Sequence, residues 1–146
     1  MKKCFQSFRN DTDAQRTFRE VMYLQKLGNH DNIIQLQHVF ISDCWKDLYL
    51  IFDLMETDLH VVICAHILHK VHHQYIIYQL LKALKYIHSA GLIHRDIKPS
   101  NLLINSNCKI KLCDFGLCRS LSQVDGRYLT DYVATRWYRS PEVCSS

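Results

Sequence analysis

Polar residues that could do chemistry gather in the segment HRDIKPSN, residues 94–101, and shortly after it. Asp96, Lys98 and Asn101 lie in the segment, and Asp114 follows it. An amide oxygen beside a carboxylate makes a pair of hard ligands, of the kind that Mg²⁺ shares with phosphate and water. A second carboxylate can orient a hydroxyl and take its proton, while a nearby lysine stabilises a phosphoryl group in transit. The set predicts phosphoryl transfer, with Asp96 and Lys98 catalytic and with Asn101 and Asp114 as metal ligands.

Two short apolar segments are expected to bring these residues together. NLLI (101–104) and KIKLC (109–113) have the composition of strands, and the turn between them indicates a hairpin. The outer ends of a hairpin meet, so Asn101 and Asp114 become neighbours. Any one of the four polar residues alone fits a capped loop with surface charges, but that interpretation does not explain all four in this order.

The remaining elements predict a mixed α+β fold. Apolar residues spaced by three and four predict helices at 11–27, 58–68 and 71–90. Alternation and β-forming residues predict strands at 33–41 and 48–52. Residues 114–146 show no sustained period, and a polar stretch of this length inside a compact domain is usually functional or disordered.

For two of these elements the sequence also predicts which residues share a face. In the helix 11–27, a residue among 11–13 is expected to cap the start. Its expected apolar stripe consists of Phe18, Val21, Met22 and Leu24. In the strand 33–41, Ile34, Leu36 and Phe40 are expected to lie on one side.

Composition favours one soluble domain of the cytoplasm or nucleus. The chain has 146 residues, 48% of them hydrophobic, and a net charge of +4. Its basic residues are scattered, so no nucleic-acid partner is expected. No signal peptide and no membrane-spanning run are visible. The seven cysteines form no CxxC pair, and the histidines of 66–73 have no obvious further ligands, so a helix end or loop is favoured there over a metal site.

HRDIKPSN and the DFG of 114–116 resemble the catalytic and metal-binding loops of protein kinases. SPE (140–142) stands where that family has APE, and the resemblance covers essentially the whole chain. It implies a partial bilobal kinase fold. Residues 1–52 would be a remnant of the small lobe, 53–58 the hinge, and 59–146 part of the large lobe with the catalytic and activation loops.

Within the kinases, the chain is similar to mitogen-activated protein kinases. Thr130, Asp131 and Tyr132 form a Thr-x-Tyr motif between DFG and SPE, and DLMETDLH (53–60) is also similar to that family. The helix 11–27 and the short activation loop are most similar to the atypical subgroup that contains mitogen-activated protein kinase fifteen. Asp131 replaces the usual Glu of the motif, and Cys118 stands where Ala is commoner.

The resemblance implies a phosphorylation switch. An upstream kinase would phosphorylate Thr130 and Tyr132. Each phosphate would then order the loop by pairing with nearby arginines. Thr135 matches the family threonine that bonds to the catalytic Asp and Lys. The arginines expected to receive the phosphates are Arg19, Arg95 and Arg119 for Thr130, and Arg136 and Arg139 for Tyr132. Each arginine taken singly also fits a solvated surface charge.

The resemblance also implies ATP and Mg²⁺ as cofactors. Lys2 would pair with Glu20 to hold the α and β phosphates, with Lys3 a slip of one residue away. The backbone near Asp53 and Met55 would hold adenine.

Phe52 would guard the deeper pocket and Leu103 would lie under the base, while plain core packing explains both as well. For Cys113 two interpretations stay open: a nucleophilic thiol reachable from the nucleotide, or an inert one whose pKa burial raises.

The implied function is an ATP-dependent protein serine/threonine kinase that acts on protein substrates, before proline as in this family. No GxGxxG motif occurs in the chain. The strand that carries the matching lysine in the family would be cut short at Met1. The chain is therefore expected to be a partial kinase domain, inactive alone. Two alternatives are a catalytically inactive isoform that acts as a binding decoy, and an incomplete gene product whose parent is active.

Overall fold

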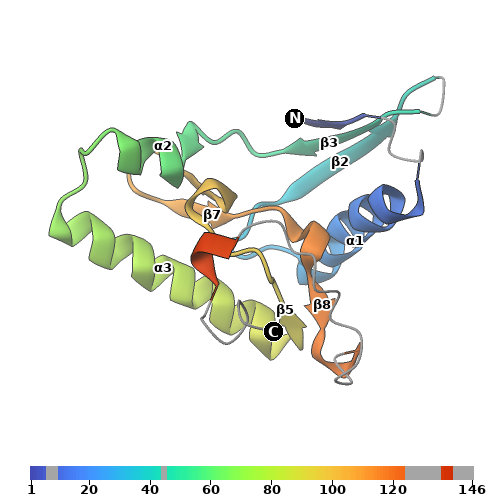
Figure 1. Ribbon diagram of the computed structural model, residues 1–146. Helices are drawn as coiled ribbons and strands as arrows, with labels where there is room; N and C mark the ends of the chain where they lie inside the picture. The colour runs from blue at the N-terminus through green and yellow to red at the C-terminus, as the bar shows by residue number, and fades with distance from the viewer. Residues whose placement is uncertain (6–9, 44–45, 124–135, 140–146) are drawn as a thin grey trace.

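The structure is a computed structural model that describes residues 1–5, 10–43, 46–123 and 136–139. The sheet β1-β3-β2 and α1 lie on one side of the molecule, and α2 and α3 lie on the other (Figure 1). This arrangement confirms the predicted mixed α+β class. In chain order the strands and α-helices are β1 (Lys2–Cys4), α1 (Asp11–Leu27), β2 (Leu36–Ile41), β3 (Leu48–Phe52), β4 (Thr57–Asp58), α2 (Leu59–Cys64), α3 (Lys70–Ser89), β5 (Leu92–Ile93), β6 (Leu102–Ile104), β7 (Ile110–Leu112) and β8 (Arg119–Ser120).

Strand β3 is the centre of the first sheet. It pairs antiparallel with β1 and with β2, and Leu50 in its middle is fully buried. The prediction that Phe40 shares a side with Ile34 is wrong, since Phe40 is 56% exposed and Ile34 is buried. The pairing of β2 with β3 shifts register between Leu36 and His38, and such a shift moves the following side chains to the other face.

Ile33 and Ile34 are buried but do not belong to this sheet. The Ile34 amide donates to the Leu112 carbonyl at 2.9 Å, and the Leu112 amide donates to the Asn32 carbonyl at 2.9 Å. The segment therefore pairs with β7 of the second sheet. The strand predicted for 33–41 begins only at Leu36 because the chain changes partner at this point.

Helix α1 lies where it was expected but buries a different face. Glu20 is buried, together with Tyr23, Leu24 and Leu27. The predicted stripe is wrong at Phe18 and Met22, which are 68% and 38% exposed. The helix packs through its Glu20 face against β1 and the short helix after Asp114, and burial of this carboxylate is possible because a lysine pairs with it.

The start of α1 also differs from the prediction. Its cap is Asn10, one residue before the predicted range, and the Asn10 side chain accepts from the Asp13 amide at 2.7 Å. Asn is among the residues that favour this position because its side chain satisfies a free helix amide. The helix ends at Gly28, whose φ of 61° suits glycine.

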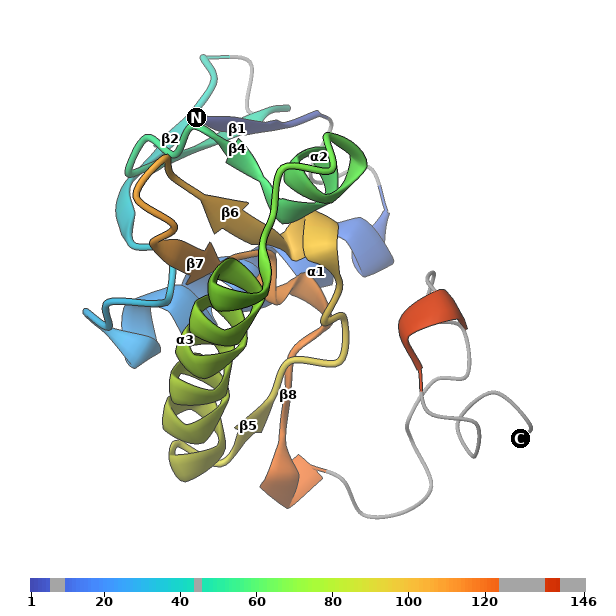
Figure 2. The ribbon, with the colours of Figure 1, turned by 90° about the vertical axis from the view of Figure 1, so that its left-hand side faces the viewer.

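The second sheet and α3 form the main core. Strands β6 and β7 make the predicted hairpin, with Leu102 opposite Leu112 and Ile104 opposite Ile110. Strand β4 extends this sheet on the β6 side (Figure 2). Helix α3 faces it with its buried side chains Ile76, Gln79, Ala83 and Ile87. None of the helices in the described residues is long and apolar enough to cross a membrane.

A buried polar network ties α3 to its neighbours. Asn32 Nδ2 donates to Gln79 Oε1 and to the Ile110 carbonyl, both at 3.0 Å. Gln79 Nε2 in turn donates to the Cys108 carbonyl at 2.8 Å. Since buried polar groups are costly unless they are bonded, this network fixes one arrangement of α3 and the hairpin.

Several short elements were not predicted. Strand β5 pairs with β8, so the chain after residue 118 returns to the end of α3. The histidines near residue 70 lie at the start of α3, where the His69 amide donates to His72 Nδ1 at 3.0 Å. Four short 3₁₀ helices complete the described structure: Pro99–Asn101, Phe115–Leu117, Leu121–Gln123 and Arg136–Tyr138.

Candidate active site

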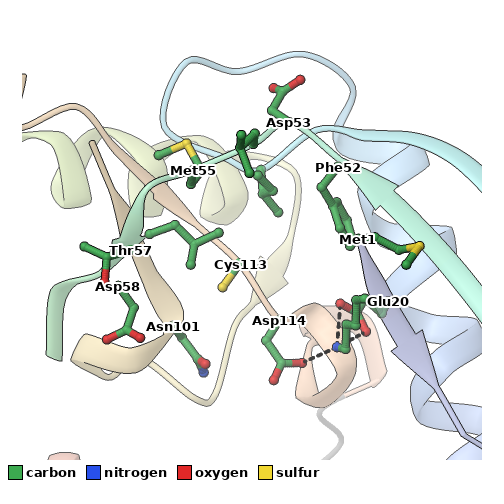
Figure 3. A pocket seen from close by; sticks show the side chains of 14 residues that line it. Met1, Glu20, Phe52, Asp53, Met55, Thr57, Asp58, Asn101, Cys113 and Asp114 are labelled. Carbon is green, nitrogen blue, oxygen red and sulfur yellow. Dashed lines mark hydrogen bonds and ion pairs between the residues drawn. The ribbon is translucent and has the colours of Figure 1, made fainter. Parts of the chain in front are cut away.

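A cavity of about 460 Å³ lies between the first sheet and the β6–β7 hairpin (Figure 3). Both predicted metal ligands, Asn101 and Asp114, line it. So do all six residues predicted to bind the nucleotide: Lys2, Glu20, Phe52, Asp53, Met55 and Leu103. The tertiary structure thus brings together residues that are far apart in the chain, such as Lys2 and Asp114.

Lys2 of β1 and Glu20 of α1 form a close ion pair on one wall of the cavity. Lys2 Nζ lies 2.9 Å from Glu20 Oε1 and 2.7 Å from Oε2, and 3.7 Å from Asp114 Oδ1. Burial raises the pKa of the Glu20 carboxyl, and the ammonium of Lys2 opposes that shift. Burial acts against the charge of Lys2 as well, but the carboxylates of Glu20 and Asp114 outweigh it and raise the pKa of Lys2. Lys3 does not share this position, because it pairs with Asp47 instead.

Phe52 and Leu103 line the cavity and also pack against the main core. The core-packing interpretation is therefore confirmed, and their roles toward a nucleotide stay predictions. Asp53 and Met55 lie between β3 and β4, in the segment that joins the two sides of the molecule. Figure 3 shows the Asp53 carboxylate turned away from the cavity, which leaves its backbone, and not its charge, as the part available to a ligand.

The predicted meeting of Asn101 and Asp114 is confirmed. The Cys113 amide donates to the Asn101 carbonyl at 3.0 Å, which holds the outer ends of the hairpin together. Asn101 Nδ2 donates to the carbonyl of Asp96 at 2.8 Å and to Asp96 Oδ2 at 2.9 Å. These bonds leave the amide oxygen of Asn101 as a ligand beside the carboxylate of Asp114, a donor set that fits Mg²⁺.

The backbone at Asp114 and at Arg95 is strained. Asp114 has φ 62° and Arg95 has φ 70°, values in the left-handed region that favours glycine. Each such residue costs about 1–3 kcal/mol and persists only where the surrounding structure holds it, often at functional sites. Here the buried Phe115 and the paired hairpin hold Asp114 in place.

Asp96 and Lys98 meet directly in the segment before the hairpin. Lys98 Nζ lies 2.9 Å from Asp96 Oδ2, the oxygen that also accepts from Asn101. The side chain of Asp96 is 11% exposed, so it is held on one side and reachable on the other. A carboxylate fixed in this way can accept a proton from a hydroxyl.

His94 is a site residue that the sequence reasoning missed. Its Nε2–H donates to the Cys113 carbonyl at 3.0 Å, and its Nδ1 accepts from the Asp96 amide at 3.2 Å. Its ring stands edge-on to Phe115, with centroids 4.9 Å apart. Burial lowers the pKa of His94, so the neutral ring holds the two loops together. The signal available in the sequence was its position two residues before Asp96.

Asp58 is a second missed residue. It lines the cavity, and its Oδ1 accepts from the Val61 amide at 3.1 Å as the cap of α2. The sequence signal was an Asp directly before an apolar helix.

Cys113 fits the inert interpretation. Burial raises the pKa of this thiol to about 12, and the neighbouring Asp114 carboxylate adds to the shift. The thiolate is the nucleophile, so a thiol with this pKa is unreactive near neutral pH.

Four of the five arginines predicted to receive phosphate lie near one another. Burial lowers the pKa of Arg95, and Arg139 and Arg19 lower it further. Burial also lowers the pKa of Arg119, followed by Arg19 and Arg95. Thr130, Tyr132 and Thr135 lie outside the described residues, as does the side chain of Arg136. The phosphate-receiving role therefore stays a prediction, as do the roles of the cavity residues.

Comparison with known proteins supports the kinase interpretation. The family model described as protein kinase domain matches residues 1–146. The chain is 60% identical over 148 residues to extracellular signal-regulated kinase 2 of Dictyostelium discoideum, covering 98% of this chain and 40% of that protein. It is 57% identical over 148 residues to mitogen-activated protein kinase 15 of Xenopus laevis, covering 98% of this chain and 25% of that protein.

These relatives are longer than the chain, which spans 40% and 25% of their lengths. A mitogen-activated protein kinase of Arabidopsis thaliana is more distant, at 48% identity over 147 residues. Together with the cavity, the matches lead to one conclusion: the chain belongs to the protein kinase family and is similar there to mitogen-activated protein kinases, including mitogen-activated protein kinase 15.

Proposed function

We propose that this site belongs to an ATP-dependent protein serine/threonine kinase of the mitogen-activated type. One observation carries the proposal. Asp96 Oδ2 holds both Lys98 and Asn101 at 2.9 Å, while Asn101 and Asp114 face the cavity that Lys2 and Glu20 also line. Phosphoryl transfer depends mostly on positioning and charge, which is what this arrangement supplies.

Each residue has a role in this proposal. Asp96 orients the substrate hydroxyl and accepts its proton. Lys98 stabilises the transferred phosphoryl group, and Lys2, fixed by Glu20, contacts the other phosphates. Asn101 and Asp114 hold Mg²⁺, which neutralises charge on the phosphate oxygens when bound.

The finer points rest on the similarity to mitogen-activated protein kinases. They are a preference for Ser or Thr before Pro, activation by an upstream kinase at Thr130 and Tyr132, protein substrates, and action in the cytoplasm or nucleus. A peptide pair that differs only in Ser-Pro against Ser-Ala tests the preference. Equal rates for the two peptides would contradict it.

Nucleotide binding is the first test. A thermal melt of the purified chain with Mg·ATP at about 100 times its dissociation constant should show about 2.7 kcal/mol of added stability. Asp114→Asn should lose this gain because it removes a metal ligand. A wild-type chain that gains nothing would overturn the proposal for this chain.

Transfer itself is the second test. Because the chain alone is expected to be inactive, the assay uses a longer protein that contains it, and there Asp96→Asn should lower the rate about 100- to 10,000-fold, the range for loss of a positioned base. If product still forms at the wild-type rate, a contaminating kinase made it. Nucleotide binding without any transfer would favour the alternative role as a binding protein that competes with active kinases for their partners.

A further inference from the structure

The segment that joins β3 to β4, residues 53–56, is held to the β6–β7 hairpin by its side chains. It has no regular secondary structure, and Leu54 in its middle is 93% exposed. Such a segment would be free to shift if only its two ends were fixed. Polar contacts at both of its ends prevent this.

Glu56 forms the first of these contacts, with the turn of the hairpin. Its amide donates to Asn105 Oδ1 at 3.0 Å. Its own Oε1 accepts from the Ser106 amide at 3.1 Å and from the Ser106 hydroxyl at 2.8 Å. We call these three residues, Glu56, Asn105 and Ser106, the latch. The bonds run in both directions, from segment to turn and from turn to segment.

Asp53 forms the second contact, at the other end of the segment. Its Oδ2 lies 3.5 Å from Lys111 Nζ of β7, and its Oδ1 accepts from Gln37 Nε2 of β2 at 2.5 Å. The side chain of Lys111 is 14% exposed. The segment is therefore tied to the hairpin at the turn and again along the strand.

The same hairpin carries the metal ligands at its open end. Asn101 precedes β6 and Asp114 follows β7, and the Asn101 carbonyl accepts from the Cys113 amide. Ile110 and Leu112 of β7 are fully buried, so the hairpin itself has little freedom. The hairpin is bonded to segment 53–56 at its turn and carries Asn101 and Asp114 at its open end. It therefore fixes the distance between the segment and these two residues.

A purely structural role would explain only part of the latch. Thr57 pairs with Ile104, so Glu56 and Asn105 are the next residues of the β4–β6 ladder. A ladder, however, uses backbone carbonyls, whereas here side chains supply the acceptors on both sides. The groups are exposed, where hydrogen bonds add little to folding. The bonds from the Ser106 amide and hydroxyl lower the pKa of the Glu56 carboxyl, which shows that they favour its charged form.

We propose that the latch is a positioning device that sets the distance between the adenine-binding segment and the metal ligands, and thereby the affinity of the cavity for Mg-nucleotide. The inference rests on the proposed function. Glu56, Asn105 and Ser106 are positioning residues, because none of them needs to touch the nucleotide.

Two measurements on the whole chain test the proposal: amide hydrogen exchange in residues 54–57, and the dissociation constant of Mg·ADP by calorimetry. Ser106→Ala removes one donor to Glu56. It should speed exchange in this segment and raise the dissociation constant about three- to tenfold, the effect of one lost hydrogen bond. Glu56→Ala should do at least as much. Ser106→Thr keeps the hydroxyl and should behave like the wild type.

Ser122→Ala is the matched control. Ser122 is also exposed and its hydroxyl also has a side-chain partner, Ser120 Oγ at 2.9 Å, but it follows β8 and does not line the cavity. It should change neither measurement. A thermal melt of each variant confirms that it is folded.

The outcomes separate this proposal from the proposed function. Unchanged exchange and unchanged affinity in Ser106→Ala and Glu56→Ala would overturn the latch. Faster exchange with unchanged affinity would also overturn it, since the contact would then be only structural. A wild-type chain that does not bind Mg·ADP at all would instead overturn the proposed function, and the affinity claim with it.

Discussion

The cavity has two walls that are built differently. The hairpin wall, formed by the β6–β7 hairpin with residues 94–101 before it, stands on a contiguous core shared with α3, in which Ile87, Ile110 and Leu112 are fully buried. The small-sheet wall, formed by β1, β3 and α1, has exposed apolar residues on its helix. It meets the rest of the site through Lys2, which pairs with Glu20 and lies 3.7 Å from Asp114 Oδ1 on the other wall.

This difference teaches where the geometry of the site is fixed. On the hairpin wall, Asp96 and Lys98 are two residues apart and Asn101 and Cys113 are bonded through backbone. On the small-sheet wall, the partners are eighteen residues apart and meet only when α1 docks. We therefore expect the hairpin wall to set the metal end firmly, and the small-sheet wall to respond to changes in one polar pair.

The largest effect should come from breaking the core of the hairpin wall. Ile87→Ala removes a fully buried side chain of α3 and should cost about 2–5 kcal/mol of unfolding free energy, because a cavity remains. Phe18→Ala on the exposed face of α1 should cost less than about 0.5 kcal/mol. Urea denaturation measures both. Equal losses would mean that the outer face of α1 is covered in solution.

A smaller effect should follow from breaking the pair on the small-sheet wall. Glu20→Gln keeps the shape but removes the charge that faces Lys2. We expect a loss of about 2 kcal/mol in unfolding free energy, less than for a fully buried pair, because the Lys2 side chain is 43% exposed and keeps Asp114 nearby.

Asp47→Asn, which weakens the pair with Lys3, is the control and should cost less, because the Asp47 carboxylate is less buried than that of Glu20. If the two variants were equally destabilised, the special position of the Lys2–Glu20 pair would be refuted.

The pH dependence of stability sharpens the comparison further. Burial holds the folded-state pKa of His94 below 6.5, so below that pH the unfolded chain binds the extra proton and the folded chain does not. Stability should therefore fall as pH drops below about 6.5, by at most about 1.4 kcal/mol per pH unit for one group.

His94→Gln should make this slope shallower, whatever its effect on absolute stability. The pKa of His30 is also lowered, by burial and then by Lys82, so some slope should remain. Urea denaturation at several pH values between 5 and 7.5 measures the slope. An unchanged slope in the variant would show that His94 does not resist protonation.

The smallest effect should come from the cap of α1. Asn10→Ala removes the acceptor for the Asp13 amide and should cost about 1 kcal/mol. Thr12→Ala lies inside the first turn and should cost less. If Thr12→Ala proved the more harmful of the two, the cap would lie inside the range predicted from the sequence after all.

Much of the hairpin wall could be predicted from the sequence. The hairpin, the meeting of Asn101 and Asp114, and the long helix α3 all follow from local patterns, because their partners are close in the chain. The pairing of Lys2 with Glu20 came only from the resemblance to a family. Nothing in the spacing of these two residues predicts a contact between β1 and α1.

The errors fall where a neighbour decides burial. The apolar stripe assigned to α1 included Phe18 and Met22, but the docked face carries Glu20, because Lys2 and the region after Asp114 lie on that side. Phe40 was predicted to share a side with Ile34 and Leu36, but the shift of register between Leu36 and His38 turns it to the other face. His94, Asp58 and the latch at Glu56 were missed because their partners are distant in the chain or lie at element ends.

The sequence by itself determined which polar residues make up the candidate site. The types and order of Asp96, Lys98, Asn101 and Asp114 require only a loop and a hairpin, and such local structure follows from nearby residues. The tertiary structure alone decided which face of α1 is buried, how His94 joins two loops, and how residues 53–56 are tied to the hairpin. Those outcomes depend on polar groups that are distant in the chain and meet only when it folds. Because an unpaired buried polar group is costly, the folded arrangement is the one in which each of these groups has a hydrogen-bond partner.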